Sequence, residues 1–545
     1  MEKRYSIGVD FGTLSVRALI ADMDTGEEKG TAVFEYPHAV MTEKLPDGTK
    51  IPKNFSLAYP EDYLNGMAAV IREAMRESGI GKDLIKGIGV DATSASVLPI
   101  TENGEPLCTL PEFVSRPHAY IKLWKHHGAA AQAQRMSRTA SARHDDWISY
   151  YGGNISPELF LPKALETEEE DPEVWNRAYR YLEVGDWITR VLTGEDVRSM
   201  SMAFCNSFYR KGSGYPPVDF WKEVAPEQEP VTRKIFGRFI PIGGIAGRLK
   251  ENSAAGLGLN AGTPVAASLI DSHASVPGCG ADRAGDMVLV IGTSVCYMMN
   301  TERGHGIPGI YSGTEEANIP GLFGYEGGQS SGGDSLEWFV KRAVPAEYER
   351  KAAEEKISIH EYLTRKASAL VPGESGLIAL DWWNGVRSPF MDPELTGVMT
   401  GLTLHTKPEE MYRAMIESVC FGGRRVLDLF GDNGVEVKRI IAGGGIARKN
   451  PMMMQIMADV LNREISVCRS RNLSVLGSAI AGASAAEGGT AESCMNAIKD
   501  MHSETDRTYR PEKKNAEIYE NLYRRFLGLS DYFLKFEHEE ESRDI

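Results

Sequence analysis

Two strand–turn–strand segments carry residue types suited to holding phosphate groups. The first lies near the N-terminus and places Asp10, Gly12 and Thr13 in the turn between two apolar strands. The second lies in the second half of the chain and repeats the pattern with Gly292 and Thr293. Small glycines let the backbone approach an anion closely, and successive N–H groups in such a turn form an anion-binding concavity. The pair of turns predicts two related lobes with a nucleotide between them.

Each turn taken alone has a simpler interpretation, because a Gly-Thr turn between apolar strands also fits an ordinary β-hairpin. Asp10 also invites comparison with phosphatases of the haloacid-dehalogenase type, in which a nucleophilic aspartate is followed two positions later by a second aspartate. Here that second position is Gly12, which argues against a nucleophile. A carboxylate beside phosphates suits Mg²⁺, so Asp10 is the predicted metal residue, directly or through water.

A third glycine turn follows a buried strand late in the chain. Gly443, Gly444 and Gly445 come directly after the apolar residues 439–442 and precede a long helix. A flat adenosine can lie against glycines without a side-chain clash. Three such turns facing one cleft predict ATP as the ligand.

Asp271 is the candidate catalytic base. Transfer of a phosphoryl group to an alcohol needs an acceptor hydroxyl in line with the γ-phosphate and often a carboxylate that takes its proton. Asp271 ends an apolar strand over residues 265–270 and is surrounded by small side chains that leave room for a substrate. The alternative is that Asp271 caps the helix that follows. His273 receives no role, and the pair at positions 126 and 127 lacks partners at a ligand spacing, so no zinc site is predicted.

The elements around these turns are those of an α/β protein. Residues 60–78 have apolar positions at helical spacing, and Gly79 closes this helix. A buried strand over residues 85–91 leads into the small residues 92–96, where a ligand can approach the backbone. Residues 115–250 are predicted to form a mostly helical insertion that holds five of the eight tryptophans. Tryptophans usually pack in cores, but an aromatic insertion can also form one wall of a sugar site.

Composition excludes several classes of function. A chain of 545 residues is too long to fold around one hydrophobic core. Its content of 42% hydrophobic and 25% charged residues is typical of a globular protein. A formal charge of −16 argues against nucleic acid or an anionic membrane as partner. The seven cysteines show no CxxC spacing, and no apolar signal region or membrane span is present in the sequence. We therefore expect reduced thiols, a cytoplasmic location and, by default, a homodimer.

These motifs together resemble the FGGY carbohydrate kinases of the actin-like ATPase superfamily, and among them the members that phosphorylate ribulose. The resemblance spans nearly the whole chain, and the family's C-terminal signature matches residues 397–402 and 410–417 in order and spacing. The other matching segments are residues 8–18, 123–125, 185–188, 192–194, 291–294, 328–330, 381–385, 443–451, 455–460 and 509–511, with Asp271 and Glu326.

The resemblance implies an architecture of two ribonuclease-H-like lobes that close over ATP and a ketose. The first lobe is expected over residues 1–280, with the helical insertion at about 115–250, and binds the sugar. The second, nucleotide-binding lobe is expected over 281–490, and 491–545 form a C-terminal helical extension.

The resemblance also implies roles for single residues. Asp271 would deprotonate the terminal hydroxyl of the sugar, and Asp10 would lie near Mg²⁺. The phosphates would contact the two Gly-Thr turns, and the adenosine the third glycine turn with Asn450. The residues expected at the sugar are Ser94, Ala95, Trp124, Asp271 and Glu326.

Two segments depart from the family's pattern and bear on the choice of sugar. Where ribulose-phosphorylating members place a sugar-contacting lysine, residues 203–207 contain none, and Val386 replaces a more usual asparagine. Losing a charged donor to a sugar hydroxyl changes affinity or the epimer that fits. The expected reaction is phosphorylation of L-ribulose at its terminal hydroxyl. D-ribulose, xylulose or another polyol is the alternative, and an actin-like, nucleotide-gated binding protein is a more distant one.

Overall fold

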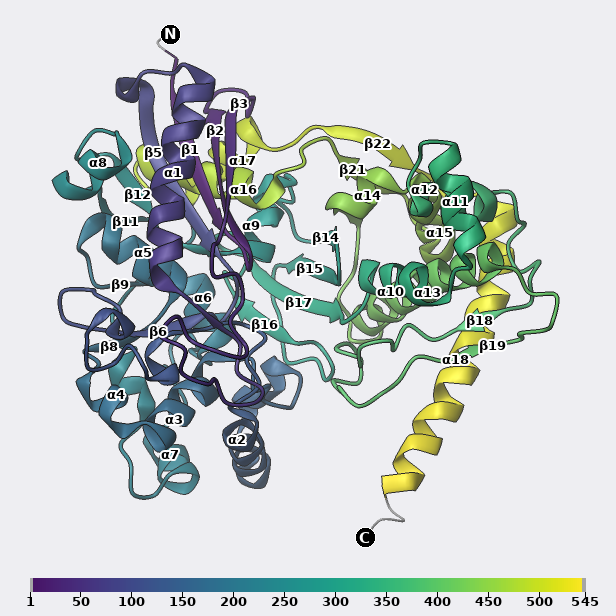
Figure 1. Cartoon of the computed structure of the whole chain (residues 1–545), viewed down its shortest axis with the longest axis horizontal. Coiled ribbons are helices and arrows are strands. Elements are labelled where there is room, and N and C mark those ends of the chain that lie inside the picture. Colours follow the sequence, from purple (N-terminus) through teal and green to yellow (C-terminus); the bar gives the residue numbers. More distant parts are fainter. Residues whose placement is uncertain (1–2, 542–545) are drawn as a thin grey trace.

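The chain forms two α/β lobes, each built on a seven-stranded mixed sheet (Figure 1). The computed structural model describes residues 3–541. The first lobe lies at the left of Figure 1 and the second at the right. This arrangement confirms the predicted α/β class with two lobes.

The first sheet has the order β11-β12-β5-β1-β2-β3, with β13 also paired to β5. Strands β1, β2 and β3 form an antiparallel meander, whereas β5 and β12 run parallel to β1. The bounds are β1 Tyr5–Phe11, β2 Ser15–Asp22, β3 Glu28–Glu35, β5 Ile85–Ala92, β11 Ile245–Arg248, β12 Pro264–Ala266 and β13 Leu269–Ile270.

The second sheet repeats this connectivity in the order β16-β17-β15-β14-β20-β21-β22. An antiparallel meander of β14, β15 and β17 is followed by the parallel strands β20 and β21 and an antiparallel edge strand, β22. The repeated Gly-Thr turn therefore marks a repeated topology. The bounds are β14 Asp286–Ile291, β15 Val295–Thr301, β16 Ser312–Glu315, β17 Phe323–Gln329, β20 Arg439–Gly443, β21 Ile465–Cys468 and β22 Thr505–Tyr509.

Helix α16 (Leu473–Ala486) returns from the second lobe to pack on the first sheet. Its contact with β5 is close enough to require glycine, since a Cβ on Gly89 would lie 1.8 Å from the carbonyl oxygen of Ser478. Helix α16 also supports α9 (Asp271–Gly278), where a Cβ on Gly477 would lie 1.7 Å from the carbonyl oxygen of Ala274. The helix that begins with Asp271 is thus held against an element from the C-terminal part of the chain.

The remaining helices cover the sheets. Helix α1 (Pro60–Ser78) follows the sequence prediction and ends at Gly79 in the left-handed conformation. The other first-lobe helices are α5 Val184–Thr193, α8 Glu251–Leu257 and α17 Ala491–Met501. Those of the second lobe are α10 Gly333–Ala343, α11 Ala346–Glu354, α12 Ile359–Ser368, α13 Pro408–Asp432, α14 Gly445–Lys449 and α15 Pro451–Leu461.

The predicted insertion contains helices and short strands that extend the first lobe, at the lower left of Figure 1. Its tryptophans mostly pack: Trp175, Trp187 and Trp221 are fully buried. Trp124 is the exception, because it lines a cavity between the lobes. The helices are α2 Ala130–Arg143, α3 Phe160–Glu170, α4 Pro172–Arg177, α6 Met200–Asn206 and α7 Val218–Val224. Its short strands are β7 Ile121–Lys122, β8 Arg180–Glu183, β9 Val197–Ser199 and β10 Arg238–Ile240. Outside the insertion, the short strands are β4 Leu57–Ala58, β6 Val97–Ile100, β18 Ile378–Ala379 and β19 Met399–Thr400.

The C-terminal stretch is less purely helical than expected. Within 491–545, α17 packs against α16, and β22 pairs with β21 as the edge of the second sheet. Helix α18 (Lys513–Glu541) follows β22 and runs from the right of Figure 1 down toward its bottom edge. It is fixed to α13 through Tyr519, whose hydroxyl contacts Arg413 and Glu417 at 2.8 and 2.9 Å. Among residues 3–541, no helix is long and apolar enough to cross a membrane.

Candidate active site

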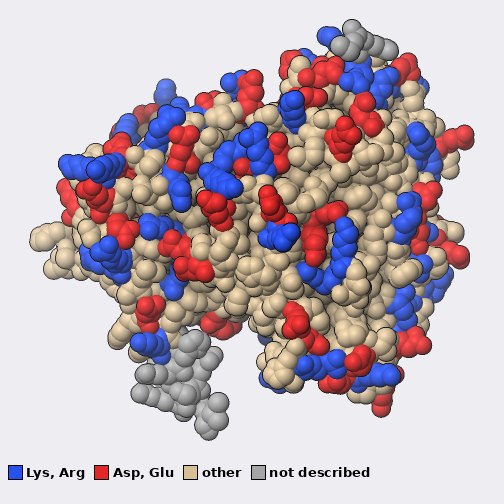
Figure 2. Space-filling view, turned by 180° about the vertical axis from the view of Figure 1, so that it is seen from behind, with Lys and Arg blue, Asp and Glu red and all other residues tan. Residues whose placement is uncertain are grey.

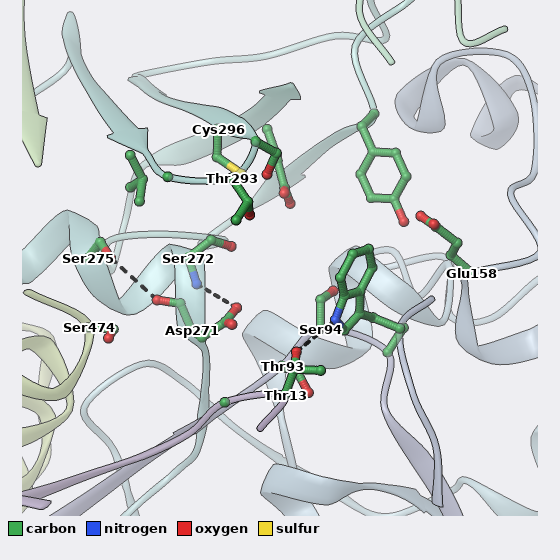
Figure 3. A pocket seen from close by; sticks show the side chains of 18 of the residues that line it. Thr13, Thr93, Ser94, Glu158, Asp271, Ser272, Ser275, Thr293, Cys296 and Ser474 are labelled. Carbon is green, nitrogen blue, oxygen red and sulfur yellow. Dashed lines mark hydrogen bonds between the residues drawn. The ribbon is translucent and has the colours of Figure 1, made fainter. Parts of the chain in front are cut away.

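A cavity of about 390 Å³ lies between the two lobes (Figure 3). The first lobe lines it with Asp10, Gly12, Thr13, Thr93, Ser94, Ala95, Trp124, Glu158, Asp271, Ser272 and Ser275. The second lobe and the start of α16 add Val290, Gly292, Thr293, Ser294, Cys296, Tyr311, Glu326, Arg387 and Ser474. The structure therefore brings the predicted base, the predicted metal residue, both Gly-Thr turns and all predicted sugar residues to one cavity.

The two Gly-Thr turns face this cavity from opposite lobes. In the first turn the amide of Gly12 donates to the carbonyl of Ser15 at 3.0 Å. In the second, the carbonyls of Gly292 and Thr293 accept from the amides of Gly333 and Gly332, at 2.9 and 2.7 Å, which ties the turn to the start of α10. Both turns are thus rigidly held with their backbone at the cavity, as a phosphate site requires.

Asp10 lies at the end of β1 beside a second carboxylate, Asp91 on β5. The Asp10 side chain accepts a hydrogen bond from the Ser474 hydroxyl at 3.0 Å. Asp91 is fully buried, one of its oxygens has no hydrogen-bond partner among the described residues, and burial followed by the charge of Asp10 raises its pKa well above the usual value. Two adjacent carboxyl groups repel each other when both are ionised, and a divalent cation beside them would remove that repulsion.

The surroundings of Asp10 fit an Mg²⁺ ion that is bound partly by substrate phosphates and water, rather than a metal ion held by protein side chains alone. Among residues 3–541, no group of three or more His, Cys, Asp or Glu side chains is placed to ligate a metal. Mg²⁺ usually keeps several waters and binds through one or two carboxylates together with substrate phosphates. Asp10, at the edge of the cavity that holds the Gly-Thr turns, meets that description.

Asp271 is the first residue of α9 and points into the cavity (Figure 3). Its side chain accepts the amide hydrogen of Ser272 at 2.7 Å, so it does interact with the start of the helix. Ile270 occupies the N-cap position. Burial, followed by the charge of Asp10, raises the pKa of Asp271 to about 7. A carboxylate with this pKa is matched to accepting a proton near neutral pH.

Glu326 on β17 contacts His273, a residue of the same helix as the proposed base and one to which the sequence analysis gave no role. The Nε2 of His273 lies 3.1 Å from a carboxylate oxygen of Glu326, and its Nδ1 lies 3.0 Å from the carbonyl oxygen of Ala317. Burial opposes protonation of the ring, but the contacts with Glu326 outweigh it and raise the pKa of His273. His273 therefore connects the helix that begins with Asp271 to Glu326.

The backbone at Ser94 and Ala95 is fixed by buried polar side chains. Ala95 has a left-handed backbone with φ of +48°, and its amide donates to Glu183 at 3.1 Å. The hydroxyl of Ser94 donates to Asn206 at 2.9 Å, and Asn206 donates in turn to Glu183. Asn206 belongs to the segment without the lysine of the family pattern, so a neutral amide stands behind the predicted sugar contact at Ser94.

A buried lysine fixes the other side of this wall. The ammonium group of Lys163 donates to the carbonyls of Ala95 and Leu123 at 2.8 and 2.7 Å. Burial lowers the pKa of Lys163 to about 7. The indole N–H of Trp124 then donates to the hydroxyl of Thr13 at 3.0 Å, so the predicted sugar wall contacts the first phosphate turn directly.

The third glycine turn lies just outside the cavity lining. Gly443 ends β20, and Gly444 has φ of +95° with its Cα so close to β14 that a Cβ would lie 2.4 Å from the carbonyl oxygen of Ile291. The turn, including Gly445, is therefore adjacent to the strand that leads to Gly292. The Asn450 side chain caps α15 by accepting the amide of Met453 at 3.0 Å. The adenosine role of these residues stays a prediction.

Sequence reasoning assigned no role to several cavity residues. Glu158 comes from a loop of the insertion, Ser474 from α16, and Tyr311 and Arg387 from loops of the second lobe. Glu158, Ser474 and Tyr311 belong to no local pattern with a recognisable spacing, whereas Arg387 directly follows Val386 in a segment compared with the family's pattern. The folding of separate segments brings these residues together. The run of small residues at 92–96 included a further cavity residue, Thr93, and the matching segment 291–294 included another, Ser294.

Family models and known proteins agree with this geometry. Residues 5–278 match the N-terminal domain and residues 287–486 the C-terminal domain of the FGGY family of carbohydrate kinases. A protein named ribulokinase from Anoxybacillus flavithermus is 40% identical over 543 residues, which are 99% of this chain and 96% of that protein. A ribulokinase from Halalkalibacterium halodurans is 41% identical over 537 residues, covering 98% and 95%.

Solved structures with lower identity share the fold. A xylulose kinase from Rhodospirillum rubrum superimposes with a TM-score of 0.79 at 23% identity, covering 98% of this chain and 100% of that one. A gluconate kinase from Lactobacillus acidophilus gives a TM-score of 0.80 at 18% identity, covering 97% and 98%. The two-lobed fold is thus common to kinases with different named substrates. The chain belongs to the FGGY family of carbohydrate kinases.

Proposed function

We propose that this kinase transfers the γ-phosphate of ATP to the terminal hydroxyl of L-ribulose, giving L-ribulose 5-phosphate and ADP. The observation that carries the proposal is the position of Asp271, in one cavity with the Gly-Thr turns of both lobes. Full-length similarity to proteins named ribulokinase supports ribulose as the sugar.

Asp271 serves as the general base in the proposed reaction. Its carboxylate accepts the proton of the terminal hydroxyl while that oxygen forms a bond to the γ-phosphorus. The bond from the γ-phosphorus to the bridging oxygen breaks in line, and its electron pair leaves with ADP. Because burial keeps the pKa of Asp271 about 7, the group is a usable base at neutral pH and returns its proton easily after product release.

The phosphates of ATP lie between the two lobes in this proposal. Gly12 and Thr13 contact them from the first lobe, and Gly292 and Thr293 from the second. The amides of Gly12 and Gly292 donate within their own turns, so the amides and hydroxyls of the two threonines are the proposed donors to the phosphates. Asp10 holds Mg²⁺ directly or through water. When bound, the ion supplies positive charge at the phosphate oxygens and offsets the repulsion between them and the carboxylates.

The adenosine is placed at the third glycine turn, beside the second phosphate turn. Gly443, Gly444 and Gly445 offer a surface without side chains, and the contact of Gly444 with Ile291 supports this placement. Asn450 contributes by fixing the start of α15 next to the turn.

The sugar is placed against the wall formed by Ser94, Ala95 and Trp124, with Glu326 on the opposite lobe. Behind Ser94 stands the neutral Asn206, in the segment that lacks the lysine of the family's pattern. Because of this difference, D-ribulose, xylulose or a polyol is the alternative substrate. Hydrogen-bonding groups in a sugar site distinguish epimers strongly, because a mismatched hydroxyl leaves a buried group unpaired.

A sugar panel with coupled detection of ADP tests the proposal. L-ribulose, D-ribulose, both xyluloses and a set of polyols are assayed at equal concentrations with ATP and Mg²⁺. We expect kcat/KM to be highest for L-ribulose. Stronger turnover of another sugar overturns the choice of substrate, and ATP hydrolysis that is unaffected by every sugar overturns the kinase assignment.

We also propose that the protein acts as a cytoplasmic homodimer without nucleic acid or membrane partners. Figure 2 shows acidic and basic side chains interspersed over one face of the molecule, in keeping with a net charge of −16. Light scattering coupled to size-exclusion chromatography measures the oligomeric state directly, and a mass near that of one chain contradicts the dimer.

A further inference from the structure

Arg387 is the one positively charged side chain among the residues that line the cavity. The lining also contains the carboxylates Asp10, Glu158, Asp271 and Glu326. The Arg387 side chain can pair with one of these carboxylates, bind a ligand, or do both, and its contacts distinguish these possibilities.

The contacts of Arg387 cross the space between the lobes. The residue lies in a loop of the second lobe, where its neighbour Ser388 donates its amide to Gly328 of β17 at 2.9 Å. Its guanidinium carbon lies 5.8 Å from the ring centroid of Trp124, and its nearest nitrogen lies 3.7 Å from Glu158. Both partners belong to the first lobe. Arg387 therefore reaches from the second lobe toward the predicted sugar wall.

The guanidinium is poorly satisfied in this arrangement. A distance of 3.7 Å is an ion pair but too long for a hydrogen bond. Within the part of the chain that the structure describes, the guanidinium donates no hydrogen bond, although it carries five N–H groups. The side chain is 30% exposed and lines the cavity, so these unpaired donors are open to a ligand that enters it.

Glu158 keeps this arginine charged and oriented without saturating it. One oxygen of Glu158 lies 3.1 Å from the ring nitrogen of His127, and the other faces Arg387. Burial would raise the pKa of Glu158, but the contact with His127 and the charge of Arg387 outweigh it and lower that pKa. Burial likewise opposes the charge of Arg387, but the charge of Glu158, together with that of Cys296, Tyr311 and Glu326, outweighs burial, so the pKa of Arg387 is raised.

The location favours a sugar over a phosphate as the ligand of Arg387. Figure 3 shows Glu158 on the side of the cavity away from Asp271 and Ser474. The groups whose charge raises the pKa of Arg387, after Glu158, are Cys296, Tyr311 and Glu326, the last of which is predicted to bind sugar. The two Gly-Thr turns are absent from these contacts.

We propose that Arg387 is a substrate-binding, specificity-determining residue that donates hydrogen bonds to oxygens of the ketose and so joins the second lobe to the sugar wall at Trp124 and Glu158. This inference rests on the proposed sugar kinase reaction. A fork of parallel N–H donors recognises two adjacent oxygens with fixed geometry, which a lysine cannot do.

The test compares Arg387→Met and Arg387→Lys with the wild-type enzyme. We expect Arg387→Met to raise the KM for the sugar about 10- to 100-fold, the range for losing hydrogen bonds to a charged group, and to leave the KM for ATP within about twofold. Arg387→Lys keeps the positive charge but loses the pair of parallel N–H donors. We expect its KM for the sugar to lie between those of the wild-type enzyme and Arg387→Met, and its discrimination among ketopentoses to be weaker. Calorimetric titration with the sugar in the absence of ATP measures the sugar affinity of the three proteins independently of turnover. We expect the wild-type enzyme to bind most tightly, followed by Arg387→Lys and then Arg387→Met.

Arg248→Met is the matched control, because this arginine lies on the edge strand β11 and is exposed. It should change neither constant. A sugar KM that stays unchanged in Arg387→Met while kcat falls or the ATP KM rises overturns the proposal and assigns the arginine to the phosphates. If Arg387→Met does not fold, Arg387→Lys decides: wild-type sugar KM and selectivity in that variant overturn the proposal.

The experiments distinguish failure of the proposed kinase reaction from failure of the proposed role of Arg387. A wild-type enzyme that neither binds nor phosphorylates any sugar of the panel overturns both proposals. Turnover of a ketose by the wild type with an unchanged sugar KM in Arg387→Met overturns only the role of the arginine.

Discussion

The indole N–H of Trp124 donates a hydrogen bond to the hydroxyl of Thr13 over 3.0 Å. Trp124 belongs to the wall predicted for the sugar, and Thr13 to the turn predicted for the phosphates. The two predicted subsites therefore share a direct contact within the first lobe, and we expect a change at one of them to affect the other.

A double-mutant cycle measures this coupling. Trp124→Phe keeps an aromatic wall but removes the donor, and Thr13→Val removes the acceptor at nearly constant volume. We expect each variant to lower kcat/KM for the sugar, and the double variant to lose about fivefold less than the product of the two, since one shared hydrogen bond contributes about 1 kcal/mol. Steady-state kinetics with both substrates varied supply the four values. Strictly multiplicative losses would show that the contact carries no coupling.

Replacing the proposed base tests the chemical step. Asp271→Asn retains the shape of the side chain and an oxygen that can accept the amide of Ser272. Turnover should fall by about 10² to 10⁴, the usual range for a positioned base, while nucleotide affinity measured by equilibrium titration changes little. A variant that keeps most of the wild-type kcat would remove Asp271 from this role.

The pH dependence of the reaction should report the same carboxyl group. Burial and the charge of Asp10 raise the pKa of Asp271 to about 7, so the base is protonated and inactive below that pH. We expect kcat/KM for the sugar to fall about tenfold per pH unit below an apparent pKa near 7 and to level off above it. A profile that is flat down to pH 5 contradicts this assignment.

The repeated fold was predictable because both lobes begin with the same local signal. In β1–β2 and in β14–β15, apolar strands flank a Gly-Thr turn, and this pattern is short enough to read directly. Strand β22 was missed because it is an edge strand of mostly polar, exposed residues and lacks an apolar alternation. An edge strand needs only one hydrogen-bonded neighbour, and that neighbour is β21, which ends 37 residues before β22 begins. The position of β22 is therefore set by the fold rather than by the local sequence.

The candidate site divides in the same way. Residues in turns or at strand ends, such as Asp10, Thr13 and Asp271, were predicted because their positions follow from the local chain. Glu158 and Arg387 could not be predicted, since their proximity depends on how the two lobes and the insertion pack together. His273 has a local neighbour of interest, but its function in holding Glu326 depends on a contact between segments 53 residues apart.

The difference in stability between the wild-type protein and Asp271→Asn should also depend on pH. A carboxyl group whose pKa is higher in the folded protein than in the unfolded chain favours folding when protonated. Its contribution is therefore fully present below about pH 3.8 and is lost as the pH rises through about 7. We expect Asp271→Asn to raise the melting temperature above pH 7 and to have no effect near pH 4, measured by differential scanning calorimetry without ligands. Equal melting temperatures at pH 8 would show that Asp271 is not strained by burial.

The contact between α16 and α9 should be as important for activity as the residues in the cavity. At Gly477 an added Cβ would lie 1.7 Å from the carbonyl oxygen of Ala274, well inside any permitted contact. Because the obstacle is backbone, Gly477→Ala must displace α9, and Asp271 begins that helix. We expect a loss of about 1–3 kcal/mol in stability, as for other overpacked sites, together with a fall in kcat.

Gly431→Ala provides the comparison, since Gly431 lies in helix α13 and its Cβ would meet nothing within 4 Å. That variant should keep the wild-type kcat and gain slightly in stability from the higher helix propensity of alanine. Thermal unfolding and steady-state kinetics of both variants are compared at one pH. A Gly477→Ala enzyme with wild-type melting temperature and kcat would mean that α9 is not held by α16, and the position of Asp271 would then need another support.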